Sequence, residues 1–121
     1  MPVSGVICQI RTTDLEESIH FYVSKLGLQL SFRYENFYAG VQAGDQVFHL
    51  KLTDNKDPSI GFVAEGDHFH LYFTTDDVEA KAEEVERNGV SFLKPISETP
   101  WGTKEFSVLD NQGHTLYFGQ L

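Results

Sequence analysis

The sequence contains very little cysteine and has no long apolar run. Cys8 is its single cysteine, so no disulfide can form within the chain. The thiol lies in the short apolar run 6–10, where we expect it to be buried and inert. No segment approaches the roughly 20 apolar residues that a membrane-spanning helix requires. These absences exclude a disulfide-stapled scaffold and predict a chain that does not span a membrane.

Basic residues are also scarce, with 9 Lys and Arg against 18 Asp and Glu and a formal net charge of −9. This excess of negative charge repels phosphate backbones and anionic lipids, so neither nucleic acid nor membrane is expected as a partner. It is compatible with a cationic ligand, although an acidic surface that aids solubility is the simpler interpretation. Residues 1–11 lack the basic and apolar segments of a secretory signal, which predicts a cytoplasmic protein.

A length of 121 residues predicts a single domain that spans 1–121. Within it the sequence repeats, because the run Thr-Thr-Asp at 12–14 aligns with the same run at 74–76 and further matches follow at that offset. With a one-residue adjustment, the apolar stripes of two predicted helices also coincide. The duplication predicts two modules of one plan, at about 1–55 and about 66–121.

Each module is predicted to contain a strand, a helix and three further strands. In the first module Asp14 is a good N-cap and Gly27 ends the helix. In the second module Asp76 or Asp77 caps a helix that ends near Gly89. The polar segment 54–59 contains a proline and is predicted to be an exposed loop, in a linker that runs to about 67. The predicted strands are 6–11, 29–34, 38–43, 46–53, 69–74, 91–95, 104–109 and 114–119.

Strand alternation predicts which side chains face the helices. In the fourth strand the apolar residues face them, which leaves His49 and Lys51 on the other face of the sheet. In the second module His70, Tyr72 and Tyr117 also point away from the helices. A face that carries aromatic and polar groups suggests a surface that encloses a pocket. We therefore expect the functional site on this face.

Two stretches carry a family resemblance, the run 13–22 with Leu26-Gly27 and the run 110–116. Over nearly its whole length the sequence resembles the glyoxalase, bleomycin-resistance and extradiol-dioxygenase superfamily, also called the vicinal oxygen chelate superfamily. The resemblance implies an α+β fold built from two βαβββ modules. In this fold the modules form an eight-stranded, partly open barrel-like mixed sheet with helices on its outer face.

Two further stretches resemble the bleomycin-resistance branch in particular, the Pro-Trp-Gly segment 100–106 and the hairpin segment 32–41. Proteins of that branch are acidic homodimers that confer antibiotic resistance by sequestering a cationic, aromatic glycopeptide without chemical change. The resemblance implies that Trp101 and Phe32 stack on a planar ligand. The other predicted ligand-binding residues come from their surroundings and from the face away from the helices: Tyr38, Phe106, Tyr117, His49, His70 and Tyr72.

Enzymes of this superfamily hold a divalent metal at four positions, on the first and last strands of each module. Carried over to this sequence, the positions fall on Ile7, His70, Tyr117 and either His49 or Lys51. An isoleucine has no lone pair for a metal, and a protonated lysine repels it. We therefore expect no metal cofactor, while a reduced site of His49, His70 and Tyr117 stays open as an alternative.

The leading hypothesis is a non-catalytic homodimer with pockets between its subunits, which sequesters a planar small molecule that a positive charge would favour. The alternative is a divergent metal-dependent enzyme of the same fold, acting as a lyase, isomerase or dioxygenase. A third hypothesis is an interaction module without a small ligand. The residues do not name the ligand, nor do they decide whether the two modules pack within one chain or exchange between subunits.

Overall fold

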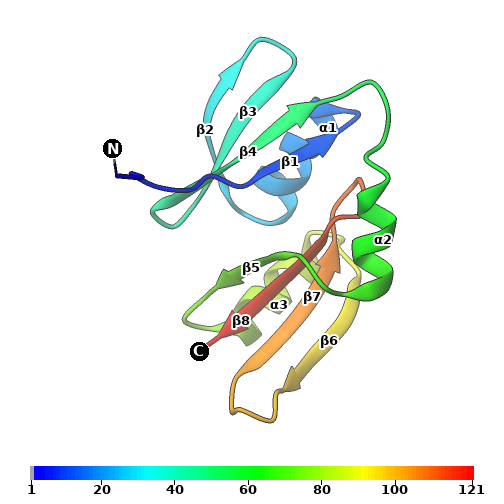
Figure 1. Ribbon diagram of the computed structural model, residues 1–121. Coiled ribbons are helices and arrows are strands. Elements are labelled where there is room, and N and C mark those ends of the chain that lie inside the picture. The colour runs from blue at the N-terminus through cyan, green and yellow to red at the C-terminus, as the bar shows by residue number, and fades with distance from the viewer. Residues whose placement is uncertain (1) are drawn as a thin grey trace.

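The computed structural model describes residues 2–121, which form two modules of one plan joined by helix α2 (Ser59–Gly66) (Figure 1). The first module consists of β1 (Gln9–Thr12), α1 (Leu15–His20), the π-helical turn η1 (Phe21–Lys25), β2 (Gln29–Tyr34), β3 (Tyr38–Ala43) and β4 (Gln46–Leu52). The second consists of β5 (Leu71–Thr74), α3 (Val78–Arg87), β6 (Phe92–Glu98), β7 (Lys104–Leu109) and β8 (Thr115–Gln120). This arrangement confirms the predicted α+β class and the two βαβββ modules.

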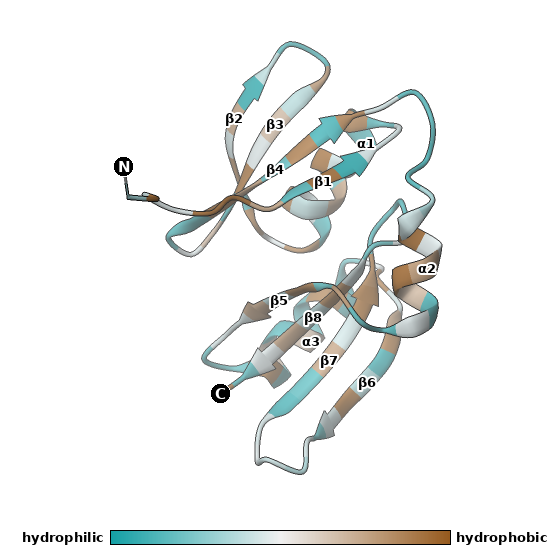
Figure 2. Ribbon diagram, in the orientation of Figure 1, coloured by the Kyte–Doolittle hydropathy of each residue, from teal (hydrophilic) through white to brown (hydrophobic). Residues whose placement is uncertain are grey.

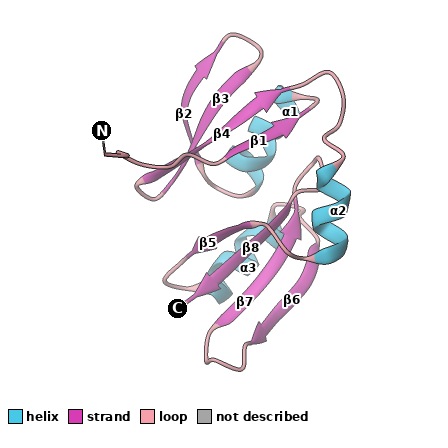
Figure 3. Ribbon diagram, viewed as in Figure 1, coloured by secondary structure: helices cyan, strands magenta, loops and turns pink. Residues whose placement is uncertain are grey.

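Each module forms a four-stranded mixed sheet, in the orders β1-β4-β3-β2 and β5-β8-β7-β6 (Figure 3). The first strand of each module pairs in parallel with the last, and the other pairs are antiparallel. Within residues 2–121 the two sheets share no strand pairing, so they form two sheets beside each other and no closed barrel.

Both module helices begin at a capping aspartate. The Asp14 carboxylate accepts a hydrogen bond of 3.0 Å from the Glu17 N–H, and Asp77 accepts one of 3.0 Å from the Ala80 N–H. These bonds satisfy N–H groups that have no partner inside the helix. Asp77, and not Asp76, is therefore the second cap. Helix α1 contacts β3 and β4, and α3 contacts β6, β7 and β8, so each helix covers one face of its own sheet.

The helices and the covered sheet faces enclose one continuous core, and apolar and polar residues alternate along the strands that border it (Figure 2). Tyr22 is fully buried, and its hydroxyl donates to Asp110 Oδ2 at 2.5 Å. Burial, together with the negative charge of Asp110, raises the pKa of Tyr22. The ring of Phe48 meets that of Phe73 at a centroid separation of 5.9 Å. Because these contacts join the two modules, the modules share their core.

The linker and the module starts differ from the sequence-based expectation. Residues 59–66 form α2, which follows Pro58 and buries Ile60, in the part of the linker for which no helix was predicted. The fixed φ of proline suits the start of a helix, and that signal was misinterpreted as a loop. The first strands are shorter than predicted because backbone pairing begins only at Gln9 and Leu71, and Phe69 is 70% exposed. No helix in the described part of the chain is long and apolar enough to cross a membrane.

Candidate functional site

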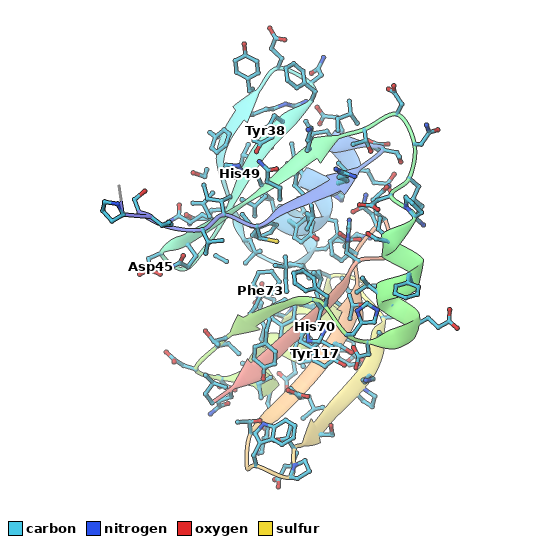
Figure 4. The ribbon with its side chains drawn as sticks, viewed as in Figure 1. Tyr38, Asp45, His49, His70, Phe73 and Tyr117 are labelled. Atoms are coloured by element: carbon cyan, nitrogen blue, oxygen red, sulfur yellow. The ribbon has the colours of Figure 1, made fainter. Side chains whose placement is uncertain are left out.

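Each sheet has one face under its helix and one face without a helix, which we call the open face. Leu50 and Phe118 are buried on the covered faces. His49 and Tyr117, which precede them, therefore lie on the open faces because side chains alternate along a strand. Figure 4 shows His49, His70 and Tyr117 on the side of the sheets opposite to α1 and α3. The open faces are thus the surfaces on which the sequence predicts function.

The open face of the first sheet carries a cluster of aromatic and hydrogen-bonding side chains. A hydrogen bond of 2.7 Å joins the Tyr38 hydroxyl to His49 Nδ1, and the Gln9 amide donates to the same hydroxyl at 2.7 Å. The Phe32 ring stacks on Tyr38 at a centroid separation of 6.2 Å and meets His49 edge-on. A Cβ at Gly40 would overlap the Phe32 ring, so the ring can lie over this position only because the residue is glycine. The result is a fixed aromatic surface edged by neutral hydrogen-bonding groups.

The open face of the second sheet carries stacked rings. His70 lies on Tyr117 with ring centroids 4.1 Å apart, and Tyr72 is parallel to Tyr117 within 8° at 6.2 Å. The Tyr72 hydroxyl donates to Glu105 Oε2 at 2.9 Å. Burial and this hydrogen bond raise the pKa of Tyr72 to about 12. A Cβ at Gly119 would overlap the Tyr72 hydroxyl, so a glycine again makes room for an aromatic side chain.

One end of the second open face carries a charged cluster of Asp67, Lys94 and Tyr117, which we call the clasp. Lys94 Nζ donates to the Tyr117 hydroxyl at 2.8 Å and to Asp67 Oδ2 at 3.0 Å, and the Tyr117 hydroxyl donates to Asp67 Oδ2 at 2.7 Å. Desolvation works to raise the pKa of Asp67, but hydrogen bonds from Tyr117 and Lys94 lower it. Bonds to Tyr117 and Asp67 raise the pKa of Lys94. The clasp is therefore an ion pair bridged by a phenol.

The structure brings most of the predicted ligand-binding residues onto the two open faces. Phe32, Tyr38 and His49 lie on the first sheet, and Tyr72 and Tyr117 on the second, where His70, directly before β5, stacks on Tyr117. Their contact with a ligand stays a prediction. Trp101 lies in the turn between β6 and β7 and is 75% exposed, so its ring is accessible to a ligand.

Phe106 is a correction to the predicted set. It is 1% exposed and packs against Phe118 with ring centroids 5.0 Å apart, on the covered face of the second sheet. Glu105 directly precedes Phe106 and Ser107 directly follows it, so alternation along β7 places these two residues on the open face instead. Phe106 is therefore a core residue and does not face the predicted ligand.

Strand register decides between His49 and Lys51 as the first-module counterpart of Tyr117. Gln9 on β1 pairs with His49 on β4, in the same way that Tyr72 on β5 pairs with Tyr117 on β8. Lys51 pairs two residues further along, with Arg11. His49 is thus the residue that occupies the position in question.

The donor groups at the superfamily's metal positions fit a divalent cation poorly. Ile7 offers no lone pair to a metal. Burial is the main cause of the raised pKa of Tyr117, so this phenol keeps its proton, and the Lys94 ammonium lies 2.8 Å from its oxygen. Residues 2–121 contain no group of three or more His, Cys, Asp or Glu side chains arranged to hold a metal ion.

The polar residues of the second open face that are missing from the sequence-based prediction include Asp67, Lys94 and Glu105. Alternation with the apolar Phe106 was a signal that could have found Glu105. Asp67 lies in the predicted linker, and no local pattern pairs it with Lys94 on a strand of the second module. Their contact follows from tertiary structure alone.

A cleft of about 790 Å³ lies where the edges of the two sheets approach each other. Its lining is largely apolar and comes from both modules, with Ile7, Phe48 and Phe73 among its residues. Tyr72 also lines it, which connects the cleft to the second open face. The thiol of Cys8 borders the cleft, and burial raises its pKa, so it stays a neutral thiol. The volume is suitable for a small organic ligand.

The family model that matches this chain is the Glyoxalase/Bleomycin resistance protein/Dioxygenase superfamily, over residues 6–118. No curated protein matches the sequence at a significant level. The bleomycin-binding protein from bleomycin-producing Streptomyces verticillus, solved with copper(II)-bleomycin, is 25% identical with a TM-score of 0.72, covering 98% of this chain and 96% of its own.

Two other solved structures show the same fold at lower identity. TioX from Micromonospora sp. ML1 is 19% identical with a TM-score of 0.77, covering 98% of this chain and 96% of its own. Lactoylglutathione lyase from Agrobacterium tumefaciens is 16% identical with a TM-score of 0.71, covering 98% of this chain and 95% of its own. The fold is therefore common to proteins whose names indicate different activities.

Proposed function

Because the chain belongs to the glyoxalase/bleomycin resistance protein/dioxygenase superfamily, we propose that it is a non-catalytic protein that binds a planar small molecule. The observation that carries this proposal is the concentration of rings on the two open faces: Phe32, Tyr38, His49, His70, Tyr72 and Tyr117. Phe32 and Tyr72 are 41% and 39% exposed and offer ring surface to a flat ligand, whereas Tyr117 is 6% exposed and lies beneath His70. The poor fit of the same residues to a divalent metal supports binding without a metal cofactor.

The bleomycin-binding protein of Streptomyces verticillus supports this class of ligand, since its structure contains copper(II)-bleomycin and its sequence is 25% identical over 98% of this chain. The exposed Trp101 is a further stacking surface at the rim of the second sheet. Glu105 presents a carboxylate on the open face, where a positively charged group of the ligand would pair with it. We propose sequestration of such a molecule, for example an antibiotic, as the biological role.

We further propose that the protein is a homodimer and that the ligand lies between its subunits. Strand β2 is exposed at every position, and the register places its exposed Phe32 and Tyr34 on the open face. Contiguous exposed apolar side chains of this kind commonly mark an interface. A second copy placed over the open faces would cover these residues and enclose a ligand that a single copy leaves open to water.

Titration of Trp101 fluorescence with bleomycin tests the proposal, together with sedimentation analysis of the oligomeric state. We expect saturable quenching by a dimer, and about tenfold weaker binding by Phe32→Ala, because the variant loses a stacking face. Phe62→Ala is the matched control, since Phe62 is also an exposed ring, 70% exposed, but lies on α2. Its affinity should be that of the unchanged protein.

Two outcomes would contradict the proposal. A stoichiometric divalent metal in the purified protein, lost on His70→Ala, would favour the metal-dependent lyase, isomerase or dioxygenase. A thermal-shift screen in which no planar compound raises the Tm would favour an interaction module without a small ligand.

A further inference from the structure

Asp67 reaches the second open face from outside the sheet. It directly follows α2 and has a left-handed backbone with a φ of 53°. Its carboxylate contacts side chains of β6 and β8 through the hydrogen bonds of the clasp. Asp67 therefore brings a negative charge from the connecting segment to a position on the surface where the ligand is proposed to lie.

Donors from three different places converge on this carboxylate. Lys94 Nζ and the Tyr117 hydroxyl both donate to Oδ2, at 3.0 and 2.7 Å. His70 Nδ1 lies 3.7 Å from Oδ1 and, although buried, has no hydrogen-bond partner. An ammonium, a phenol and an imidazole together are suited to binding a carboxylate, because charge-assisted hydrogen bonds are the stronger ones. The donors belong to the second module, whereas the acceptor belongs to the linker.

The clasp also covers a hydroxyl that has no partner. In the strand register Ser107 on β7 pairs with Lys94 on one side and with Tyr117 on the other. The hydrogen bond between Lys94 and Tyr117 therefore passes over Ser107, which is fully buried and whose Oγ makes no hydrogen bond. Leaving a buried hydroxyl unpaired is unfavourable, because it has lost its hydrogen bonds to water. A ligand oxygen that opens the clasp could pair with it.

Charge on the open faces differs from the acidic balance of the whole chain. The chain has a net charge of −9, but the register places Arg11 and Lys51 side by side on the first open face, where Asp57 pairs with Arg11 alone, at 3.7 Å. Lys94 adds a third cation on the second face, where Glu105 is the carboxylate contributed by a strand. Without Asp67, the open faces would therefore attract an anionic group.

We propose that Lys94, Tyr117 and His70 form a binding site for a carboxylate group of the ligand, and that Asp67 occupies this site until the ligand displaces it. The inference rests on the proposed function, since it assigns a chemical group to the planar molecule held by the open faces. Asp67 is tethered beside its donors, so it competes at a high effective concentration and weakens the binding of a free carboxylate. Removal of Asp67 should therefore strengthen the binding of carboxylates and of no other group.

The test compares benzoate, its neutral analogue benzamide, and acetate, each titrated into the full-length protein and followed by amide chemical shifts in NMR spectra. Asp67→Gly removes the carboxylate without strain, because glycine adopts a positive φ freely. We expect about tenfold tighter binding of benzoate by Asp67→Gly, corresponding to one charge-assisted interaction released for the ligand. Benzamide should bind with unchanged affinity. Adding Lys94→Met to Asp67→Gly should abolish the gain.

Asp67→Asn provides a second variant, which keeps the size of the side chain and removes its charge. Asp54→Asn is its matched control, because Asp54 is an exposed carboxylate after β4 that makes no hydrogen bond within the clasp. We expect tighter benzoate binding by Asp67→Asn and no change by Asp54→Asn. The inference is wrong if the control variant gains as much affinity for benzoate as Asp67→Asn. It is also wrong if the affinity for benzamide rises as much as that for benzoate, or if the gain in benzoate affinity survives Lys94→Met.

The same titrations separate this inference from the proposed function. If acetate binds more tightly to Asp67→Gly but no planar compound depends on Phe32, the carboxylate site exists and the stacking proposal fails. If planar compounds bind in a Phe32-dependent manner and neither Asp67 variant gains affinity for benzoate, the stacking proposal holds and the carboxylate site is refuted.

Discussion

The two modules share a backbone plan and differ in the chemistry of their open faces. Both begin their helix at a capping aspartate and pair their first and last strands in parallel. Both place an aromatic ring over a glycine, Phe32 over Gly40 and Tyr72 over Gly119. The shared features are those on which the backbone and the core depend. The other side chains on the open faces do not hold the backbone or the core together, so they can differ between the modules and serve function.

Equivalent positions on the two open faces have different partners. His49 bonds to Tyr38 on the neighbouring strand of its own sheet. Tyr117, its counterpart, bonds to Asp67 of the linker and to Lys94. The hydrogen bonds of the aromatic cluster on the first face therefore lie within one sheet, whereas Tyr117 on the second face bonds to a charge supplied from outside the sheet. Variants that alter the core, the glycine positions and Glu105 test this contrast.

The largest expected effect concerns the core that both modules share. Phe118 is 2% exposed and stacks on Phe73 and Phe106 at 5.0 Å, and its first-module counterpart Leu50 is 1% exposed. Phe118→Ala should lower the free energy of unfolding by about 3–5 kcal/mol, and Leu50→Ala by about 2–5 kcal/mol. Urea denaturation followed by circular dichroism measures both. Two separate transitions in either variant would contradict a core common to the modules.

A smaller effect is expected at the glycines beneath the aromatic rings. A methyl group at Gly40 or Gly119 would overlap Phe32 or Tyr72, and each ring is partly exposed and can move aside. We expect Gly40→Ala and Gly119→Ala each to lower the free energy of unfolding by about 1 kcal/mol. In the double variant Gly40→Ala with Phe32→Ala the two losses should be less than additive, because the overlap is gone. Full additivity would show that the overlap is not the cause.

The sequence predicts the module plan well because several local signals agree. Asp14 caps its helix as expected, and alternation places His49, His70, Tyr72 and Tyr117 on the open faces. Helix α2 was missed, because Pro58 is as typical of a loop as of a helix start. The separation into two sheets could not be predicted either, because local sequence patterns do not determine whether the edge strands of two modules pair.

The candidate site could be predicted from the sequence only in its aromatic part. Rings on alternating positions are visible in a strand pattern, but the clasp joins Asp67 to Lys94 and Tyr117 through contacts between distant segments. Phe106 was assigned wrongly because the resemblance to the bleomycin-resistance branch was followed over alternation, which places it on the covered face. Where a family resemblance and strand alternation disagree, alternation should decide, because it follows directly from the geometry of a β-strand.

The smallest expected effect is a shift in the titration of Tyr72, whose ring is 39% exposed and therefore partly screened by water. Its pKa of about 12 lies above the ordinary value of 10.0, so the folded protein holds this proton more tightly than the unfolded chain. The resulting stabilisation is present below pH 10 and is lost as the pH rises towards 12.

Glu105→Gln removes the charge and weakens one cause of the raised pKa of Tyr72, while burial, the larger cause, remains. The pKa of Tyr72 should therefore fall part of the way towards its ordinary value, which phenolate absorbance detects by comparison with Tyr72→Phe. Glu83→Gln on the exposed side of α3 should leave the titration unchanged. If Glu105→Gln also leaves it unchanged, the Tyr72–Glu105 hydrogen bond does not persist in solution. Glu105 would then be free to pair with a ligand.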